Sequence, residues 1–405
     1  MPIALRRDFL LPEDPGVSLP ERIPIASYAP GLDARVCARA VELLDKLRQS
    51  EMMPFGSESR VASTTDSSFS ILEISDLKNP YAGPWLVTGV GCFGGTALAA
   101  SASGAVPSNL ALWIYDNDRG MTLMKTAVLL PVLFDLDSNK TYLIRPHVMG
   151  PAASLYVRVE NQGGASTGVW VSFTGETVLG KKITAAEVRE AIGLGVYPSP
   201  QWRSGLWSGG ALASLFDNDA VCATQSGEQL RWELRSRIAY LRLKLAESSL
   251  RPFSLYGRAI DVPQAGSLPV EIASLRNDSG FPLLVSKVTF GTVASLAATA
   301  IGAIFSNIAI QVFLTGGLEE DRYMLWRRVL APTLVARATS IWQFERPVLV
   351  RSDEAFKVTA LEQYIAATTD LYANFQGFYA QGLSADEARE CVALGLLSGW
   401  SRPGD

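Results

Sequence analysis

Histidine is the rarest of the residues in this chain that could carry out chemistry. His147 is the only one, so a catalytic triad with a histidine base could be built only around this residue. One histidine also cannot supply the several nitrogen or sulfur ligands that a catalytic zinc site usually has. His147 directly follows Arg145 and Pro146, and we expect it to be a solvent-facing residue of a strand or loop.

Carboxylates are the second group of candidates. The stretch Asp116-Asn117-Asp118 resembles the start of a calcium loop, but the position that needs a closing glutamate is Ala127. A β-turn rich in Asp and Asn explains the stretch without a metal. Carboxylate pairs for glycoside hydrolysis would have to come from residues whose spacing does not force them together. We therefore expect a solvated surface for Asp116, Asp118, Asp135, Asp137 and Glu160.

Glycines and cysteines add no cofactor site. Gly89 to Gly94 fits the dinucleotide-binding pattern Gly-x-Gly-x-x-Gly, but the residues that follow do not begin a convincing helix. The cysteines are far apart and have no Cys-x-x-Cys spacing, which predicts free, mostly buried thiols in a reducing cytoplasm for Cys37, Cys92, Cys222 and Cys391. We predict no catalytic residue, no metal and no cofactor.

Charge and hydropathy limit the partners of the chain. The formal net charge is -4 at pH 7 and no basic stripe is present, so DNA or RNA is not expected as a direct ligand. Thr289 to Leu314 is uncharged and long enough to span a bilayer. The matching stretch, Leu86 to Tyr115, is interrupted by many glycines, so we interpret both as strand, loop and strand, with no membrane segment.

The chain contains an internal repeat displaced by about two hundred positions. Residues of the first copy recur in order, such as Leu43, Lys46, Pro54, Phe55, Glu187 and Glu190 as Leu241, Lys244, Pro252, Phe253, Glu387 and Glu390. This tandem duplication predicts two similar domains. We place an extended, proline-rich arm at 1–34, the first domain at 35–200, a linker region at 201–228 and the second domain at 229–405.

Periodicity predicts the elements that position these residues. Helical spacing covers Asp33 to Met52 and Gln229 to Leu250, while period-two alternation, as in Leu155 to Glu160, predicts short strands separated by turns. A capping box begins a short helix at Thr184 and again at Ser384. The predicted fold is mainly β, with two tandem, duplicated antiparallel β-sandwich (jelly-roll-like) domains, each flanked by short α-helices.

The Arg-Pro pairs are the sharpest polar feature that both halves retain. Two explanations remain open: an arginine contact between domains or subunits, or an arginine that caps carbonyl groups where a proline ends a strand. The arm also carries apolar groups that a free tail would leave in water. The candidate interface or structural residues are Arg145, Pro146, Arg346, Pro347, Arg60, Arg258, Phe9 and Leu10.

One part of the first half resembles a known family. The stretch Ile114 to Gly120, then Leu123-Met124, Pro131-Val132 and Leu155 to Asn161, resembles a β-sandwich pattern of virion proteins from double-stranded DNA bacteriophages. The resemblance is fainter in the second half, where Asp-Arg-Gly of the turn becomes Thr-Gly-Gly. It implies a structural role in a virus particle and carries no catalytic residues.

The sequence is compatible with three classes of function. The first is a non-enzymatic virion structural protein of the capsid shell, its decoration, or the tail or fibre, made in the host cytoplasm. Its partners would be other virion proteins and itself, as a homo-oligomer such as a trimer that imitates a six-fold arrangement. The second is a carbohydrate- or receptor-binding module that binds glycan through exposed Trp113, Tyr115 and Trp170. The third, an enzyme, is disfavoured.

Overall fold

The computed structural model describes much of the 405-residue chain. The described residues are 30–64, 69–72, 79–95, 110–117, 119–124, 126–134, 140–161, 167–180, 182–197, 222–259, 262, 269–293, 308–316, 322–325, 328–334, 341–362 and 370–397. Phe9, Leu10 and most of the predicted arm and linker lie outside them.

The first half forms two antiparallel sheets. Its elements are α1 (Pro30–Arg48), β1 (Glu51–Thr64), β2 (Phe69–Leu72), β3 (Trp85–Gly95), β4 (Leu110–Asp116), β5 (Met121–Thr122), β6 (Val128–Leu129), α2 (Leu130–Leu133), β7 (Lys140–Met149), β8 (Leu155–Asn161), β9 (Thr167–Leu179) and α3 (Ala185–Gly193). The strand orders are β1-β9-β3-β7 and β2-β8-β4-β5, with β6 paired to β4.

The second half has the same order, element by element. It contains α5 (Gln225–Glu247), β10 (Ser249–Ala259), β11 (Val270–Arg276), β12 (Leu283–Val293), β13 (Ile308–Gly316), β14 (Arg322–Tyr323), β15 (Val329–Leu330), α6 (Ala331–Leu334), β16 (Ile341–Val350), β17 (Glu354–Glu362), β18 (Asp370–Gln381) and α7 (Ala385–Ala393). Its sheets run β10-β18-β12-β16 and β11-β17-β13-β14, with β15 paired to β13. The mainly β, antiparallel fold class predicted from the sequence is confirmed.

Alternating burial explains why these segments are strands. In β8 the side chains of Leu155, Val157 and Val159 are fully buried, while their neighbours lie at the surface of the sheet. The two sheets of each half enclose a separate apolar core, centred on Trp85 and Phe173 in the first half and on Phe356 and Phe375 in the second. Burial of these side chains supplies the main stabilisation of each sandwich.

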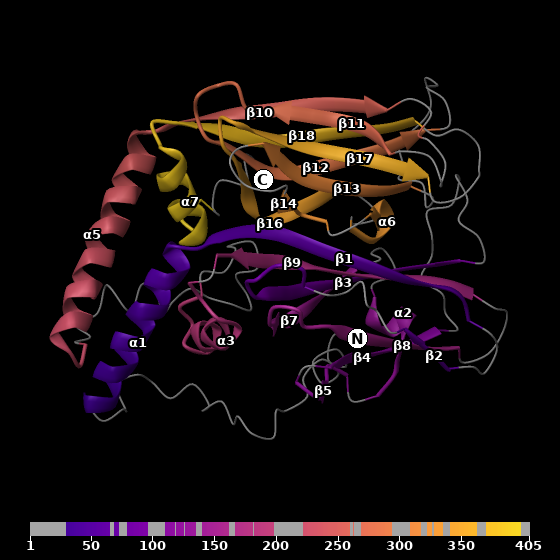
Figure 1. Ribbon diagram of the computed structural model, residues 1–405, viewed down its shortest axis with the longest axis horizontal. Helices are drawn as coiled ribbons and strands as arrows, with labels where there is room; N and C mark the ends of the chain where they lie inside the picture. Colours follow the sequence, from indigo (N-terminus) through magenta and orange to yellow (C-terminus); the bar gives the residue numbers. More distant parts are fainter. Residues whose placement is uncertain are drawn as a thin grey trace, which may run out of the picture.

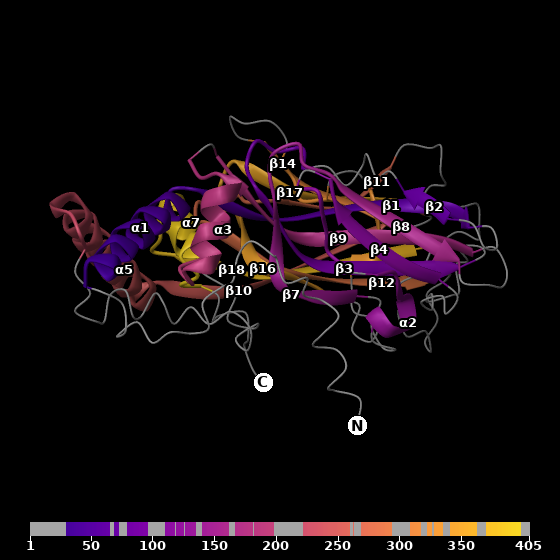
Figure 2. The same cartoon turned by 90° about the horizontal axis from the view of Figure 1, so that it is seen from below.

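The helices α1, α3, α5 and α7 lie together at one end of the sandwiches, with α5 outermost in both views (Figures 1 and 2). Both predicted capping boxes are present: Thr184 and Ser384 accept from the amides of Glu187 and Glu387, whose carboxylates accept in return. The predicted boundaries of the two long helices differ in detail. The first ends at Arg48, so that Glu51 and Met52 belong to β1, and the second already begins at Gln225, inside the predicted linker, where Thr224 caps it.

Both Arg-Pro pairs lie inside strands, at a bulge. In β7, His147 pairs with Val87 and Tyr142 with Gly89, so the pair occupies the extra residues between them. The register of β16 against β12 shifts at the corresponding place. A bulge leaves backbone groups out of the ladder, which is where a proline without an amide hydrogen is tolerated. The strands do not end at the prolines. The explanation in which a proline ends the strand beside a carbonyl-capping arginine is therefore wrong.

The uncharged segment Thr289 to Leu314 begins in strand β12 and ends in strand β13. Within the described ranges, no helix is both long and apolar enough to cross a membrane.

Candidate functional site

The prediction that His147 faces solvent is wrong. His147 is 8% exposed, and its Nε2 lies 2.7 Å from Oδ2 of Asp116, which is 1% exposed. The other carboxylate oxygen of Asp116 accepts from the backbone amide of Arg119. His147 comes from β7 and Asp116 from the end of β4, so the pair joins the two sheets of the first sandwich.

The expectation of a solvated surface is therefore also wrong for Asp116. The turn that follows it has Gly120 in the left-handed region, at a φ of 62°, in agreement with a turn rich in Asp and Asn. Among the described residues no three His, Cys, Asp or Glu side chains are grouped as metal ligands would be.

The glycine-rich stretch Gly89 to Gly94 belongs to strand β3 and does not precede a helix. A Cβ atom at Gly91 would lie 2.3 Å from the carbonyl oxygen of Thr333 and 2.4 Å from Oγ of Ser172. Glycine at this position thus permits close approach of the second half to the first, a structural role that differs from phosphate binding.

A set of polar contacts joins the two halves. We define the docking face as the outer side of β1, β3 and β9, and the docking edge as β14, β15 and α6. The backbone amide of Gly56 donates to the Met324 carbonyl at 2.9 Å. The Glu58 carboxylate accepts from the Leu330 amide at 3.1 Å and from Oγ1 of Thr333 at 3.0 Å. The halves therefore meet through two different surfaces, in a head-to-tail manner.

A buried ion pair lies beside this contact. Nε of Arg346 is 3.0 Å from Oε1 of Glu176, and each side chain is 2% exposed. Tyr197 donates its hydroxyl hydrogen to Glu176 at 2.9 Å, and Nη1 of Arg346 donates to the Val392 carbonyl at 2.8 Å. The cluster connects β9 and the segment after α3 with β16 and α7, so it spans both halves.

Burial of these groups changes their protonation equilibria. Burial raises the pKa of Tyr197 well above its ordinary value, and the neighbouring Glu176 carboxylate raises it further. Burial alone would lower the pKa of Arg346, but attraction to Glu176, Tyr197 and Glu345 and the hydrogen bond to Glu176 together outweigh burial, so the pKa is raised. The tyrosine is therefore a neutral donor and the arginine a permanent cation, as a structural cluster requires.

A second ionic cluster ties the start of β1 to the second half. Arg322 is 7% exposed and pairs with Glu51 of the first half and with Glu354 of its own half. Arg351 contacts the same Glu51 at 3.2 Å. Thr88 of β3 also donates to Glu345 of β16. The charges buried between the halves are thus matched by opposite charges or hydrogen bonds, as stability requires.

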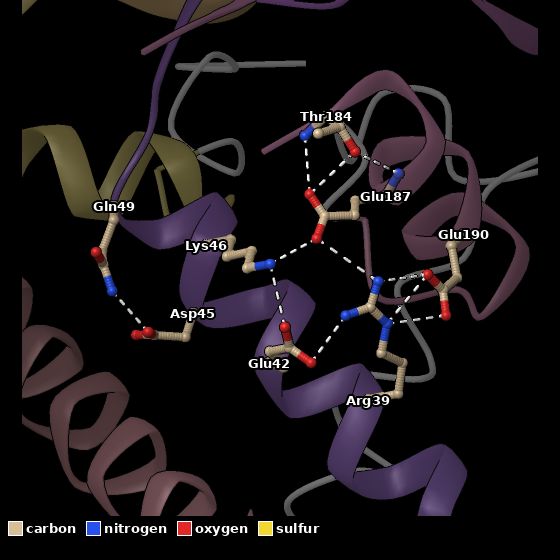
Figure 3. Close-up of polar contacts among 8 residues, drawn as sticks. All are labelled: Arg39, Glu42, Asp45, Lys46, Gln49, Thr184, Glu187 and Glu190. Atoms are coloured by element: carbon tan, nitrogen blue, oxygen red, sulfur yellow. Dashed lines mark hydrogen bonds and ion pairs between the residues drawn. The ribbon is translucent and has the colours of Figure 1, made fainter. Parts of the chain in front are cut away.

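The helices of each half are joined by ion pairs at equivalent places. Figure 3 shows the ion pairs of the first half. Arg39 of α1 lies between Glu42 and Glu190, 2.8 Å from each, and Lys46 contacts Glu187 at 2.5 Å. In the second half Arg237 of α5 contacts Glu390 of α7 at 2.9 Å. Arg39 and Arg237 are repeat counterparts, as are Glu190 and Glu390, so this pair positions the helices in both halves.

Glu187 should make stability depend on pH in the acid range. Partial burial alone would raise its pKa, but hydrogen bonds from Lys46 and Thr184 outweigh burial and lower the pKa to about 2. A depressed folded-state pKa adds stability above the unfolded value, about 4.5, which is lost as the pH falls towards 2. We expect Glu187→Gln to cost less than about 1 kcal/mol at pH 7, since the network is accessible to solvent.

Urea unfolding of the wild type and Glu187→Gln at a series of pH values would measure this effect. Glutamine preserves the capping box, so the variant isolates the charge. The difference should shrink between pH 4.5 and pH 2. A difference that stays constant across that range would contradict the assigned role of Glu187.

The prediction of free, buried thiols is confirmed for all four cysteines. Sγ of Cys37 lies 2.8 Å from Sγ of Cys222, which brings α1 next to the start of α5. Burial raises the pKa of Cys92 and Cys222, and that of Cys391 to about 12. Thiols with raised pKa values are poor nucleophiles, because the thiolate is the reactive form.

We therefore expect the native protein to react with Ellman's reagent at none of its cysteines within the time of manual mixing. After unfolding in guanidinium chloride, all four should react. Rapid labelling of a thiol in the native protein would show that this part of the fold opens.

The predicted interface residues are distributed over several environments. Arg346 and Pro347 are buried near the half-to-half contact, and Pro146 is buried in β7. Arg60 pairs with Trp170 in the β1–β9 ladder. Arg258 is exposed, with its guanidinium 5.4 Å from the ring centre of Tyr372. The structure brings Arg346, but not Arg258, into the cluster with Glu176.

The aromatic residues proposed for glycan binding do not form one exposed platform. Trp170 is 3% exposed and packs against Ala309 and Leu330 of the second half, so its predicted exposure is wrong. Trp113 and Tyr115 are half-buried and stack at 5.6 Å between ring centres, beside Tyr156 of the paired strand. Packing across the sheet accounts for these contacts.

Sequence reasoning missed Glu176, Tyr197, Glu58 and Arg322, which belong to the polar clusters between the halves. One signal was present for Glu176. The pairing of β9 with β3 and of β18 with β12 makes Phe378 its counterpart. An acidic residue in one half at a position that is apolar in the other indicates a requirement specific to that half.

The geometry defines a mainly β protein of two like antiparallel sandwiches joined by a buried ionic contact. No protein-family model and no curated protein matches the chain. Among solved structures, the VP2 subviral particle of infectious bursal disease virus is 8% identical, with 84% of this chain and 74% of that chain covered and a TM-score of 0.24.

PBCV-1 VP54, fitted into a reconstruction of the virophage Sputnik, is also 8% identical, with coverage of 81% and 94% and a TM-score of 0.19. Vicilin from hazelnut, Corylus avellana, is 8% identical as well, with coverage of 80% and 74% and a TM-score of 0.15. Because these TM-scores are all below 0.5, neither fold nor function is inferred from the similarities.

Proposed function

We propose that the chain is a non-enzymatic virion structural protein, a bacteriophage component of the capsid shell, its decoration, or the tail or fibre. The observation that carries the proposal is the contact between the halves. Two sandwiches with the same strand order are held head to tail by an ion pair that is 2% exposed on both sides. Such a chain is a rigid block of two similar units.

This arrangement suits a protein that assembles with itself. A chain with two near-equivalent units contributes two places to a closed ring, so three chains imitate a six-fold arrangement. In this proposal the domains are tandem duplicates, and the arm at 1–34 binds a neighbouring surface.

The test is sedimentation of the purified chain together with electron micrographs of the same sample. Rings or shells at raised protein concentration would support the proposal. A monomer at every concentration would contradict it, and a monomer that binds a glycan array would support the carbohydrate-binding alternative.

A further inference from the structure

The contact inside the chain uses only half of the surfaces that the repeat provides. It joins the docking face of the first half to the docking edge of the second. Because the halves share one strand order, the second half has its own face, on β10, β12 and β18, and the first half has its own edge, on β5, β6 and α2. Among the described residues, these two surfaces do not meet each other.

The unused edge exposes apolar side chains. Leu129 is 39% exposed and Val132 57%. Their counterparts in the used edge, Leu330 and Thr333, are fully buried against the first half. The strand pairing fixes the correspondence, since Leu129 pairs with Ala111 in the same way as Leu330 pairs with Ala309.

The unused face also exposes side chains whose counterparts in the first half take part in the contact. Tyr256 is 62% exposed, and its counterpart is Glu58, which receives the hydrogen bonds from the used edge. Register again fixes the match, because Phe55 pairs with Gly175 and Phe253 with Gly377. Most described side chains of β1 are buried, whereas those of β10 are mostly exposed or half-buried.

Counterpart positions of α1 and α5 also differ in exposure. The carbonyl of Ala34 in α1 accepts from the amide of Ala223, just before α5. Its counterpart in α5 is Trp232, which is 69% exposed on the outermost helix (Figures 1 and 2). Conversely, Leu234 is 1% exposed, whereas its counterpart in α1, Val36, is 39% exposed.

These surfaces hold most of the large hydrophobic side chains that are exposed in the described part of the chain. Nine large hydrophobic residues are exposed in the part of the chain that the structure describes. Seven of them belong to the unused face, the unused edge or the two long helices: Val36, Leu129, Val132, Trp232, Tyr240, Leu243 and Tyr256. Exposed apolar residues concentrated in this way mark an interaction surface.

We propose that the unused face and α5 of one chain bind the unused edge and α1 of a second copy, repeating between chains the contact that joins the halves. The inference rests on the proposed function and specifies the surfaces that assembly uses. The occupant is a second copy because each unused surface is the counterpart of one half of a contact that the chain already makes. A head-to-tail contact of this kind closes into a ring when the rotation permits.

Engineered cysteines test the contact directly. Tyr256→Cys and Val132→Cys occupy the counterparts of Glu58 and Thr333, which are 3.0 Å apart at their side-chain oxygens. The two single variants are mixed, oxidised with copper phenanthroline, and separated on a gel without reductant. Each introduced thiol loses a proton and the pair loses two electrons to the copper oxidant as the disulfide forms. We expect a covalent dimer from the mixture, and a closed three-chain product from the double variant.

A mismatched pair is the control. Asp386, on α7, has a side chain that is 82% exposed, and its counterpart Ala186 is also exposed although the contact between the halves is made. Asp386→Cys mixed with Val132→Cys should therefore give no covalent dimer. All native cysteines are buried, so the introduced thiols are the reactive ones.

A second variant needs no oxidation. Val132→Asp puts a charge at the centre of the proposed contact and should lower the association constant in sedimentation by more than about tenfold, without unfolding an exposed site. Assembly that persists unchanged in this variant, with no matched covalent dimer, would overturn the inference and leave the proposed function standing. A wild-type chain that never associates would overturn both.

Discussion

Replacement of Arg346 by leucine should lower the free energy of unfolding by about 3 to 5 kcal/mol, because it leaves a buried carboxylate without its counter-charge. Arg346 and Glu176 are each 2% exposed and 3.0 Å apart. The change also removes the donor to the Val392 carbonyl, at 2.8 Å. Urea unfolding followed by tryptophan fluorescence measures the loss.

Two further variants separate the charge from the packing. In Arg346→Leu combined with Glu176→Gln, no ionised group remains buried in the pair, so most of the lost stability should return. Arg276→Ala removes an arginine whose ion pair with Asp278 is 73% and 77% exposed, and should cost less than about 1 kcal/mol. Equal losses for Arg346→Leu and Arg276→Ala would show that the ion pair between the halves adds little.

The structural features that could be predicted from the sequence depend on residues that are close together in the chain. Leu155, Val157 and Val159 alternate with polar neighbours, and this spacing alone makes one face of a strand apolar. The capping boxes at Thr184 and Ser384 also depend on residues three positions apart. Elements of this kind follow from short-range sequence, and so did the mainly β fold.

The contacts between the halves could not be predicted in this way. Glu176 and Arg346 meet across 170 positions, and only the packing of one sandwich on the other makes them neighbours. The sequence shows that Arg346 recurs as Arg145, but not that an acidic residue approaches it. Long-range pairing of charges depends on the arrangement of whole domains, which the spacing of residues does not contain.

The counterpart of His147 in the second half indicates that this histidine is buried. Its counterpart, Val348, is an aliphatic residue that is 2% exposed, and the counterpart of Asp116 is Leu314, also 2% exposed. A polar residue whose counterpart is aliphatic occupies a position that the fold buries. The comparison of the halves therefore predicts burial of His147, whereas its residue type alone favoured exposure.

The same correspondence predicts the result of a double-mutant cycle. Val348 and Leu314 show that this kind of sandwich accommodates two aliphatic side chains where the first half has His147 and Asp116. Either single replacement, His147→Val or Asp116→Leu, should cost about 2 to 4 kcal/mol, because each leaves a buried polar group without the partner that lies 2.7 Å away.

The double variant should lie much closer to the wild type than the sum of the two losses, which corresponds to a coupling energy of about 1 to 3 kcal/mol. Asp116 also accepts from the amide of Arg119, so recovery should be incomplete by the cost of that lost bond. Urea unfolding of the four proteins at pH 7 gives the coupling energy. Losses that simply add would mean that His147 and Asp116 stabilise the sandwich independently, and that an apolar pair cannot replace them in the first half as it does in the second.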